Sequence, residues 1–181
     1  MTRTLAALLL VLFLPLSAIG RPTGSLDSGS SSSIVVASSN TTDSVVATPS
    51  PVAGLSIPVL ANTGYLIHCD LVVSSVTSTT GIYLSTTGPA SPTAVTIKSQ
   101  VFTSTTGPAA TNLNAFSTGT GNNEHAPASS SGASNFRLTY RLDIVLRNGA
   151  SAGNVVPNID TEVDTSAVTA HAGSWCESRT F

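Results

Sequence analysis

The sequence predicts an all-β protein: an antiparallel β-sandwich, or jelly-roll-like domain, preceded by an extended N-terminal arm. Two long segments alternate apolar and polar residues with a period of two, which is typical of half-buried strands. Short stretches rich in Gly, Pro and Asn separate the segments and predict turns. The chain also has 28 serines and 25 threonines among 181 residues, and only 9% of its residues are charged. This composition favours β structure and argues against a coiled coil or a helical bundle.

Residues 1–20 have the pattern of a secretory signal peptide, and a hydrophobic arm that becomes buried in an assembly is the alternative. Arg3 precedes an apolar run from Leu5 to Leu16, and small residues precede a cleavage position before Arg21. This run is too short for a stable membrane span, which needs about 20 apolar residues. The residues alone leave cleavage and burial both open.

Residues 21–53 are predicted to form a Ser/Thr/Pro-rich linker. Serines crowd residues 28–33, and residues 48–51 read Thr-Pro-Ser-Pro. Two apolar patches, residues 34–37 and 45–47, are long enough for brief strands. The remainder has too little apolar surface to offset the entropy lost on ordering, so we expect an extended tether.

Residues 54–181 are predicted to form the β-sandwich domain. In residues 65–73 the apolar side chains fall on one face, and His68 and Asp70 fall on the other. Residues 136–147 alternate more clearly, with Arg141 and Asp143 on the polar face. One wet face and one apolar face indicate antiparallel strands that cover a core.

Weaker alternation predicts further strands at residues 81–85, 94–102, 158–164, 167–172 and 174–179. Turn signals separate them, at residues 87–89, 106–108, 147–150 and 172–173. Residues 111–135 are rich in Asn, Gly and Ser, and predict a long loop or a short strand flanked by loops. Trp175, the only tryptophan, follows the last turn, and we expect it to anchor the end of the core.

The sequence has no motif for catalysis, cofactor binding or metal binding. His68, His125 and His171 are not spaced as metal ligands, and Cys-x-x-Cys does not occur. Residues 149–153 read Gly-Ala-Ser-Ala-Gly, but they begin in a predicted turn between strands and not in the strand-to-helix turn of a nucleophile elbow. A Cys–His nucleophile pair would use Cys69 or Cys176, but Cys69 lies on the apolar face, where thiols are usually inert. We therefore expect a protein that is not an enzyme and has no cofactor and no metal.

Three carboxylates, Asp160, Glu162 and Asp164, alternate along the strand predicted at residues 158–164. Residues on one face of a strand are about 7 Å apart, so two of these carboxylates would be able to flank a sugar or hold a calcium ion. A solvated strand face is the commoner meaning of such a pattern. We predict that these three residues are structural or solvated rather than catalytic.

The two cysteines, Cys69 and Cys176, have alternative states that depend on the compartment. In an exported protein they would form a disulfide between the first long strand and the last strand. In a protein assembled in a bacterial cytoplasm, both would remain thiols. The sequence leaves the choice open.

Residues 136–153 read FRLTYRLDIVLRNGASAG, and residues 166–175 read SAVTAHAGSW. Together with residues 79–84 and 88–90, these stretches resemble the β-sandwich domain of tailed-bacteriophage virion proteins of the head-fibre, decoration or tail-fibre type. The similarity covers roughly residues 54–181. The resemblance implies a structural role in a virion, often as a homotrimer, and it brings no catalytic residues.

We therefore expect a virion structural protein whose residues 1–53 attach the sandwich to a capsid or tail subunit. So few charges leave the sheet edges weakly guarded, which suggests a homo-oligomer, and the resemblance implies a trimer. A host-surface glycan is a further candidate partner; nucleic acid is not, because a basic patch is missing. The alternative is a secreted or cell-surface binding module with a cleaved signal peptide and a Ser/Thr-rich stalk. A hydrolase on a jelly-roll scaffold is a third interpretation, supported only by the acidic residues.

Overall fold

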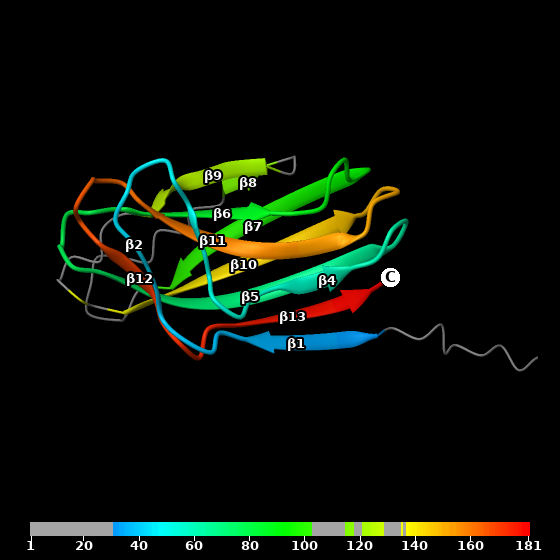
Figure 1. The fold of residues 1–181 in the computed structure, drawn as a ribbon, viewed down its shortest axis with the longest axis horizontal. Coiled ribbons are helices and arrows are strands. Elements are labelled where there is room, and N and C mark those ends of the chain that lie inside the picture. Colours follow the sequence, from blue (N-terminus) through cyan, green and yellow to red (C-terminus); the bar gives the residue numbers. More distant parts are fainter. Residues whose placement is uncertain (1–30, 103–114, 118–120, 129–134, 136) are drawn as a thin grey trace, which may run out of the picture.

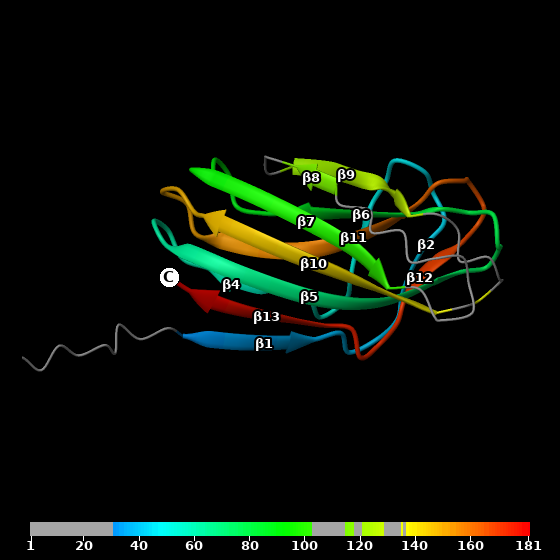
Figure 2. The ribbon, with the colours of Figure 1, turned by 180° about the vertical axis from the view of Figure 1, so that it is seen from behind.

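A computed structural model describes residues 31–102, 115–117, 121–128, 135 and 137–181, and these residues form thirteen β-strands in two sheets. Every strand pairing among the described residues is antiparallel. The two sheets lie as two layers along the length of the molecule (Figures 1 and 2). The predicted antiparallel β-sandwich is confirmed. The signal-like segment, residues 1–20, lies outside the described residues.

The larger sheet has the long strands of the sequence at its centre. Its order is β1 (Ser32–Val36), β13 (Trp175–Thr180), β5 (Gly64–Ser75), β10 (Leu138–Arg147), β7 (Ala94–Phe102) and β8 (Ala115–Ser117). A short strand, β12 (Val168–Ala170), also pairs with β5, and it pairs on its other side with β2 (Thr41–Asp43). β1 is therefore the last strand on its side of the described sheet.

The smaller sheet covers the inner face of the larger one. Its order is β3 (Ser50–Pro51), β11 (Gly153–Thr161), β6 (Ile82–Thr87) and β9 (Gly121–Ala128), and β4 (Ile57–Val59) pairs with another part of β11. Pro51 and Pro58 lie in the short outer strands β3 and β4, where proline is tolerated because one side of the strand needs no donor.

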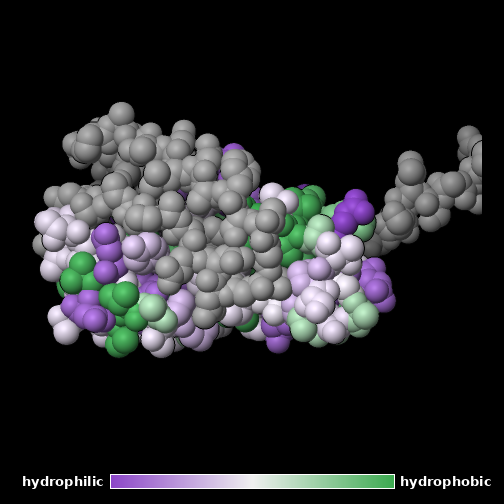
Figure 3. All heavy atoms as spheres, turned by 90° about the horizontal axis from the view of Figure 1, so that it is seen from above, coloured by the Kyte–Doolittle hydropathy of each residue, from purple (hydrophilic) through white to green (hydrophobic). Residues whose placement is uncertain are grey.

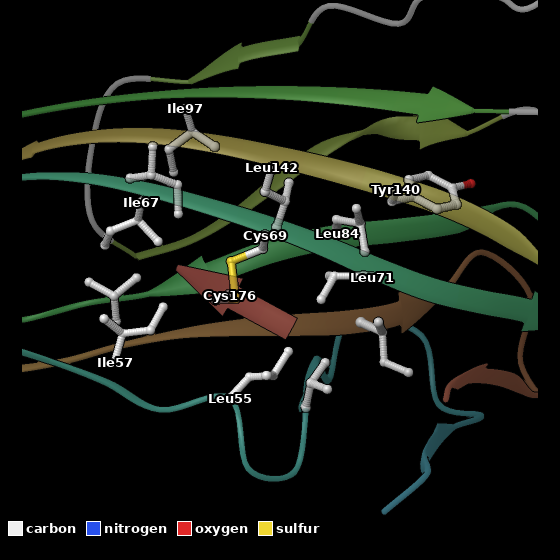
Figure 4. Packing of buried hydrophobic residues seen from close by; sticks show 14 of the residues in the cluster. Leu55, Ile57, Ile67, Cys69, Leu71, Leu84, Ile97, Tyr140, Leu142 and Cys176 are labelled. Carbon is white, nitrogen blue, oxygen red and sulfur yellow. A yellow bond between two sulfur atoms is a disulfide. The ribbon is translucent and has the colours of Figure 1, made fainter. Parts of the chain in front are cut away.

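The core lies between the sheets and follows the alternation read from the sequence. Tyr65, Ile67, Cys69, Leu71 and Val73 of β5 are all buried, and so are the alternate residues of β10 from Leu138 to Leu146. Figure 4 shows part of this core, with Leu84 of the smaller sheet and Leu55 and Ile57 from the segment before β5 in one cluster with Ile67, Cys69, Leu71, Tyr140 and Leu142. The predicted inward faces of both long strands are confirmed.

The prediction that residues 21–53 form a linker is wrong for residues 31–53, the part that the structure describes. β1, β2 and β3 all lie within it, and Ala37 and Val52 are buried in the core. Each of these strands is short and gains its backbone hydrogen bonds from a strand distant in the sequence: β1 from β13, β2 from β12 and β3 from β11. Local composition therefore does not predict them. Of the two apolar patches, only residues 34–37 fall in and directly after a strand, and residues 45–47 form a turn.

The weaker strands are confirmed with shifted bounds. β7 has the predicted bounds, whereas β11 begins earlier than predicted and ends at Thr161. Residues 111–135 contribute two strands, β8 and β9, to the described part. The turn predicted at residues 106–108 and the start of the strand at Phe136 lie outside the described residues.

Two predicted turns are built by specific side-chain and backbone features. After β10, the side chain of Asn148 is buried: its Nδ2 donates to the carbonyls of Leu60 and Ser151, and its Oδ1 accepts from the N–H of Gly149. Before β13, Gly173 has a φ of 89°, which favours glycine. In the part of the chain that is described, no helix is long and apolar enough to cross a membrane.

Candidate functional site

The outer face of the larger sheet collects half of the described charged side chains. The pairing register places them in three cross-strand rows. One row runs Ile34, Glu177, His68, Asp143, Lys98; the next runs Val36, Trp175, Asp70, Arg141, Gln100; the third runs Ser32, Arg179, Leu66, Val145, Thr96. The rows follow from the alternation along β5, β10 and β13, because polar positions on one face of paired strands lie opposite each other. We call these fifteen residues the outer face.

His68 lies at the centre of the outer face between two carboxylates. Its Nδ1 is 2.7 Å from Oδ1 of Asp143 on β10, and its Nε2 is 3.5 Å from Oδ1 of Asp70 on β5. With a carboxylate beside each ring nitrogen, the imidazole bridges two strands and is poorly placed to act as a free base. This arrangement supports a structural or binding role for His68 rather than a catalytic one.

Asp70 is also held by Arg141. Nε of Arg141 donates to Oδ1 of Asp70 at 3.1 Å, and Nη2 donates to Oδ2 at 3.4 Å. This two-point hydrogen bond raises the pKa of Arg141. On β13, Nε of Arg179 donates to Oε1 of Glu177 at 2.6 Å. The charges of the outer face are therefore largely neutralised by one another.

Trp175 lies on the outer face and is half-buried, so the prediction that it anchors the core is wrong. Its neighbour Cys176 takes the inward position and is completely buried. Since side chains alternate along a strand, Trp175 must point outward when Cys176 points inward. The indole contacts the imidazole of His68, with 5.5 Å between ring centroids.

Apolar side chains are exposed among these charges. Ile34 and Val36 of β1 are 66% and 54% exposed, and Leu66 and Val145 are 49% and 42% exposed. A shallow groove of about 390 Å³ lies over Leu66, Val145, His68, Asp143, Glu177 and Arg179. A face that mixes neutralised charges with exposed apolar groups is suited to contact with another protein.

A second exposed apolar group lies at the other end of the molecule. Val45 and Val46 precede β3, and Val163 follows β11; two hydrogen bonds, from Thr165 N–H to the Ser44 carbonyl and from Val46 N–H to Asp164, hold these loops together. Figure 3 shows apolar surface at this end, opposite the start of β1.

The structure does not form the predicted acidic strand face. Asp160 is buried within β11, whereas Glu162 and Asp164 follow the end of the strand and are exposed. Each accepts a hydrogen bond from a backbone N–H: Asp160 from Thr161, Glu162 from Gly81 and Asp164 from Val46. The three carboxylates thus point to separate partners, which supports the structural role that we predicted for them.

Asp43 is the centre of a buried polar cluster that the sequence did not predict. Its carboxylate accepts from Oγ of Ser50 at 2.8 Å and from the N–H of Thr161 at 3.1 Å, and it is 4% exposed. This residue links β2 to both β3 and β11. Asp43 lies in the segment read as a linker, and nothing in the local sequence distinguishes it from an exposed acid.

The other histidines lie apart from His68. Nε2 of His171 is 2.8 Å from Oγ of Ser74, and burial followed by the charge of Arg137 lowers the pKa of His171. His125 lies in β9, and its side chain is outside the described part. No group of three or more His, Cys, Asp or Glu side chains within the described ranges is arranged to hold a metal ion.

Cys69 and Cys176 form a disulfide between β5 and β13. Of the two states left open by the sequence, the structure contains the oxidised one. It ties the first long strand to the last strand, as the disulfide alternative predicted.

Comparison with known proteins gives little guidance. No protein-family model matches the sequence, and no curated protein matches it. Among solved structures, the chain is similar to one described as the structure of infectious bursal disease virus Gx strain, with 12% identity and a TM-score of 0.23. The match covers 83% of this chain and 36% of the viral chain, so this chain spans little more than a third of the length of the viral chain. A likeness this weak carries no argument about function.

Proposed function

We propose that this chain is a virion structural protein whose β-sandwich packs against other copies of itself through the outer face. The observation that carries the proposal is the composition of that face: exposed Ile34, Val36, Leu66 and Val145 lie among charges that already neutralise one another. Such a face offers apolar area for burial and leaves few charges to desolvate without a partner. The resemblance to phage virion domains gives the trimer as the expected assembly.

The proposal assigns attachment to the N-terminal region. The chain enters the sandwich at β1, beside the C-terminus, where the N–H of Thr180 donates to the carbonyl of Ser31 (Figure 1). Attachment through the residues before Ser31 would hold the sandwich at this end. The loops that carry Val45 and Val163 would then face away from the attachment point.

The test compares the full chain with a chain that starts at Ser31, which retains all thirteen described strands. Both are mixed with virions that lack the protein, and bound protein and oligomer mass are measured by sedimentation and light scattering. We expect both chains to be folded oligomers and only the full chain to bind. A monomeric chain from Ser31 that still decorates particles would contradict both parts of the proposal.

A second candidate function is a secreted binding module, and the disulfide is compatible with it. Disulfides persist in extracellular proteins and on virion surfaces, so the bond fits both proposals. N-terminal sequencing of the natural protein separates the two. A start at Met1 or Thr2 supports the virion arm, and a start at Arg21 supports secretion.

A further inference from the structure

The disulfide joins two residues that the backbone already holds opposite each other. β5 and β13 are paired in register from Asp70 opposite Trp175 to Tyr65 opposite Thr180, and Cys69 faces Cys176 within this ladder. Both cysteines are 0% exposed. The ladder thus brings the two sulfur atoms together without the bond, and the folded protein shields them from solvent.

On the inner face of the sheet, Val35 of β1 is the next residue beyond Cys176. Val35 is half-buried and packs against the core, and β1 is the last described strand on this side of the sheet. Leu142 occupies the corresponding place beyond Cys69, and Figure 4 shows Leu55 near the disulfide. At this edge of the sheet, the Val35 side chain therefore lies between Cys176 and the solvent.

We propose that the disulfide is a redox lock gated by β1: reagents exchange with Cys69 and Cys176 only when β1 separates from β13 and Val35 moves away. Thiol–disulfide exchange requires the attacking thiolate to reach a sulfur atom, so access limits its rate. A burial-protected bond of this kind opens only through local unfolding of the strands that cover it. The lock does not depend on the virion role and would act equally in a secreted module.

The chemistry in the oxidising direction uses a small disulfide such as oxidised glutathione. A cysteine thiolate attacks it and displaces one glutathione thiolate; the other cysteine loses its proton, attacks the mixed disulfide and displaces the second. Two protein thiols become one disulfide, and one glutathione disulfide becomes two thiols. A chain folded in a reducing compartment would thus close the lock after release into an oxidising medium, at the rate at which β1 opens, and the same gate would then slow reduction.

The test measures how fast dithiothreitol reduces the oxidised full chain in native buffer, with alkylation of new thiols followed by mass spectrometry. Val35→Ala opens the route. Val76→Ala is the matched control, because Val76 follows β5, lies outside the outer face and is 43% exposed. Val155→Ala controls for lost stability, since Val155 is buried on the other sheet.

We expect Val35→Ala to be reduced at least about tenfold faster than the unchanged chain. The shorter side chain lowers the free-energy cost of separating β1 from β13, and this partial opening is far more frequent than global unfolding. Val76→Ala should stay within about twofold, and Val155→Ala should accelerate less than Val35→Ala. Equal rates for Val35→Ala and the unchanged chain would overturn the proposal. So would equal acceleration by Val155→Ala, which would show control by global unfolding. If Val35→Ala fails to fold, the comparison uses Val35→Thr, whose hydroxyl weakens packing against the core. It should be reduced faster than Val76→Thr, and equal rates for these two variants would overturn the proposal.

Discussion

The indole of Trp175 lies beside the imidazole of His68 on the outer face, with 5.5 Å between the ring centroids and 57° between the ring planes. Tilted pairs of rings at this distance attract each other weakly. The contact joins β13 to β5 on the face opposite the disulfide, which joins the same two strands inside. β13 is therefore fixed to the central strand from both faces.

Because Trp175 is half-buried on the outer face, its fluorescence should be quenched by acrylamide in the folded monomer, measured at a concentration at which the proposed contact between copies is dissociated. Trp175→Ala should also reduce stability by less than the about 3–5 kcal/mol expected for a tryptophan in a core. Stern–Volmer quenching and urea unfolding measure the two effects. Resistance of the folded monomer to acrylamide would contradict the outward position of the indole.

Replacing both cysteines by alanine should destabilise the sandwich. The bond links residues 107 positions apart, and removing a disulfide that closes so long a loop typically costs about 2–5 kcal/mol. Urea unfolding of the double variant and of the unchanged chain gives the difference. An unchanged unfolding midpoint would mean that the ladder between β5 and β13 alone sets the stability of this edge.

The buried carboxylate of Asp43 should be important for holding β2, β3 and β11 together. Asp43→Ala removes the acceptor of the Ser50 hydroxyl and leaves the Thr161 N–H with Asp160 Oδ1 as its acceptor. The loss of one acceptor in a buried place costs about 1–3 kcal/mol. Asp43→Asn keeps one acceptor oxygen and should cost less. Thermal unfolding ranks the two variants, and an Asp43→Ala protein as stable as the unchanged chain would refute the role of this residue.

Stability should depend on the protonation of His171. Burial and then the charge of Arg137 lower its pKa, so the folded state binds the proton less tightly than the unfolded state. The contribution of neutral His171 to the free energy of unfolding is therefore complete above the ordinary histidine pKa of about 6.5, and it declines as the pH falls below that value. Arg137→Gln should raise the pKa of His171 in an NMR titration, whereas Arg147→Gln, at the other end of β10, should leave it unchanged. A titration curve that does not move in Arg137→Gln would contradict the assigned effect of this charge.

The sequence predicts best those strands in which the alternation of apolar and polar residues identifies the buried face. In β5 and β10, every second residue is apolar, so the alternation alone identifies the buried side and places His68, Asp70, Arg141 and Asp143 outside. The outer face follows from the same alternation once these two strands are paired. The edge of the outer face, strand β1, does not follow from this alternation, because β1 lies in a segment whose composition is typical of a linker.

The errors come from positions where tertiary contacts decide. Trp175 and Cys176 are adjacent, so only one of them faces the core, and the disulfide with Cys69 selects Cys176. Taking the bridge as given would have placed Trp175 outside from sequence alone. β11 ends at Thr161 because the following residues turn toward the loop at Ser44, a contact that no local pattern announces.

The last prediction concerns self-association through the outer face. Ile34→Lys combined with Leu66→Lys places two charges where the proposed contact between copies would bury apolar groups, and a buried charge without a partner strongly disfavours association. Both positions are largely exposed, at 66% and 49%, so the stability of the single sandwich should change by only about 0.5 kcal/mol for each. Asn154→Lys adds a charge at an exposed position of the smaller sheet and is the matched control. Light scattering should give a monomer for the double variant and the oligomer for the control, and an unchanged oligomer in the double variant would show that the copies meet elsewhere.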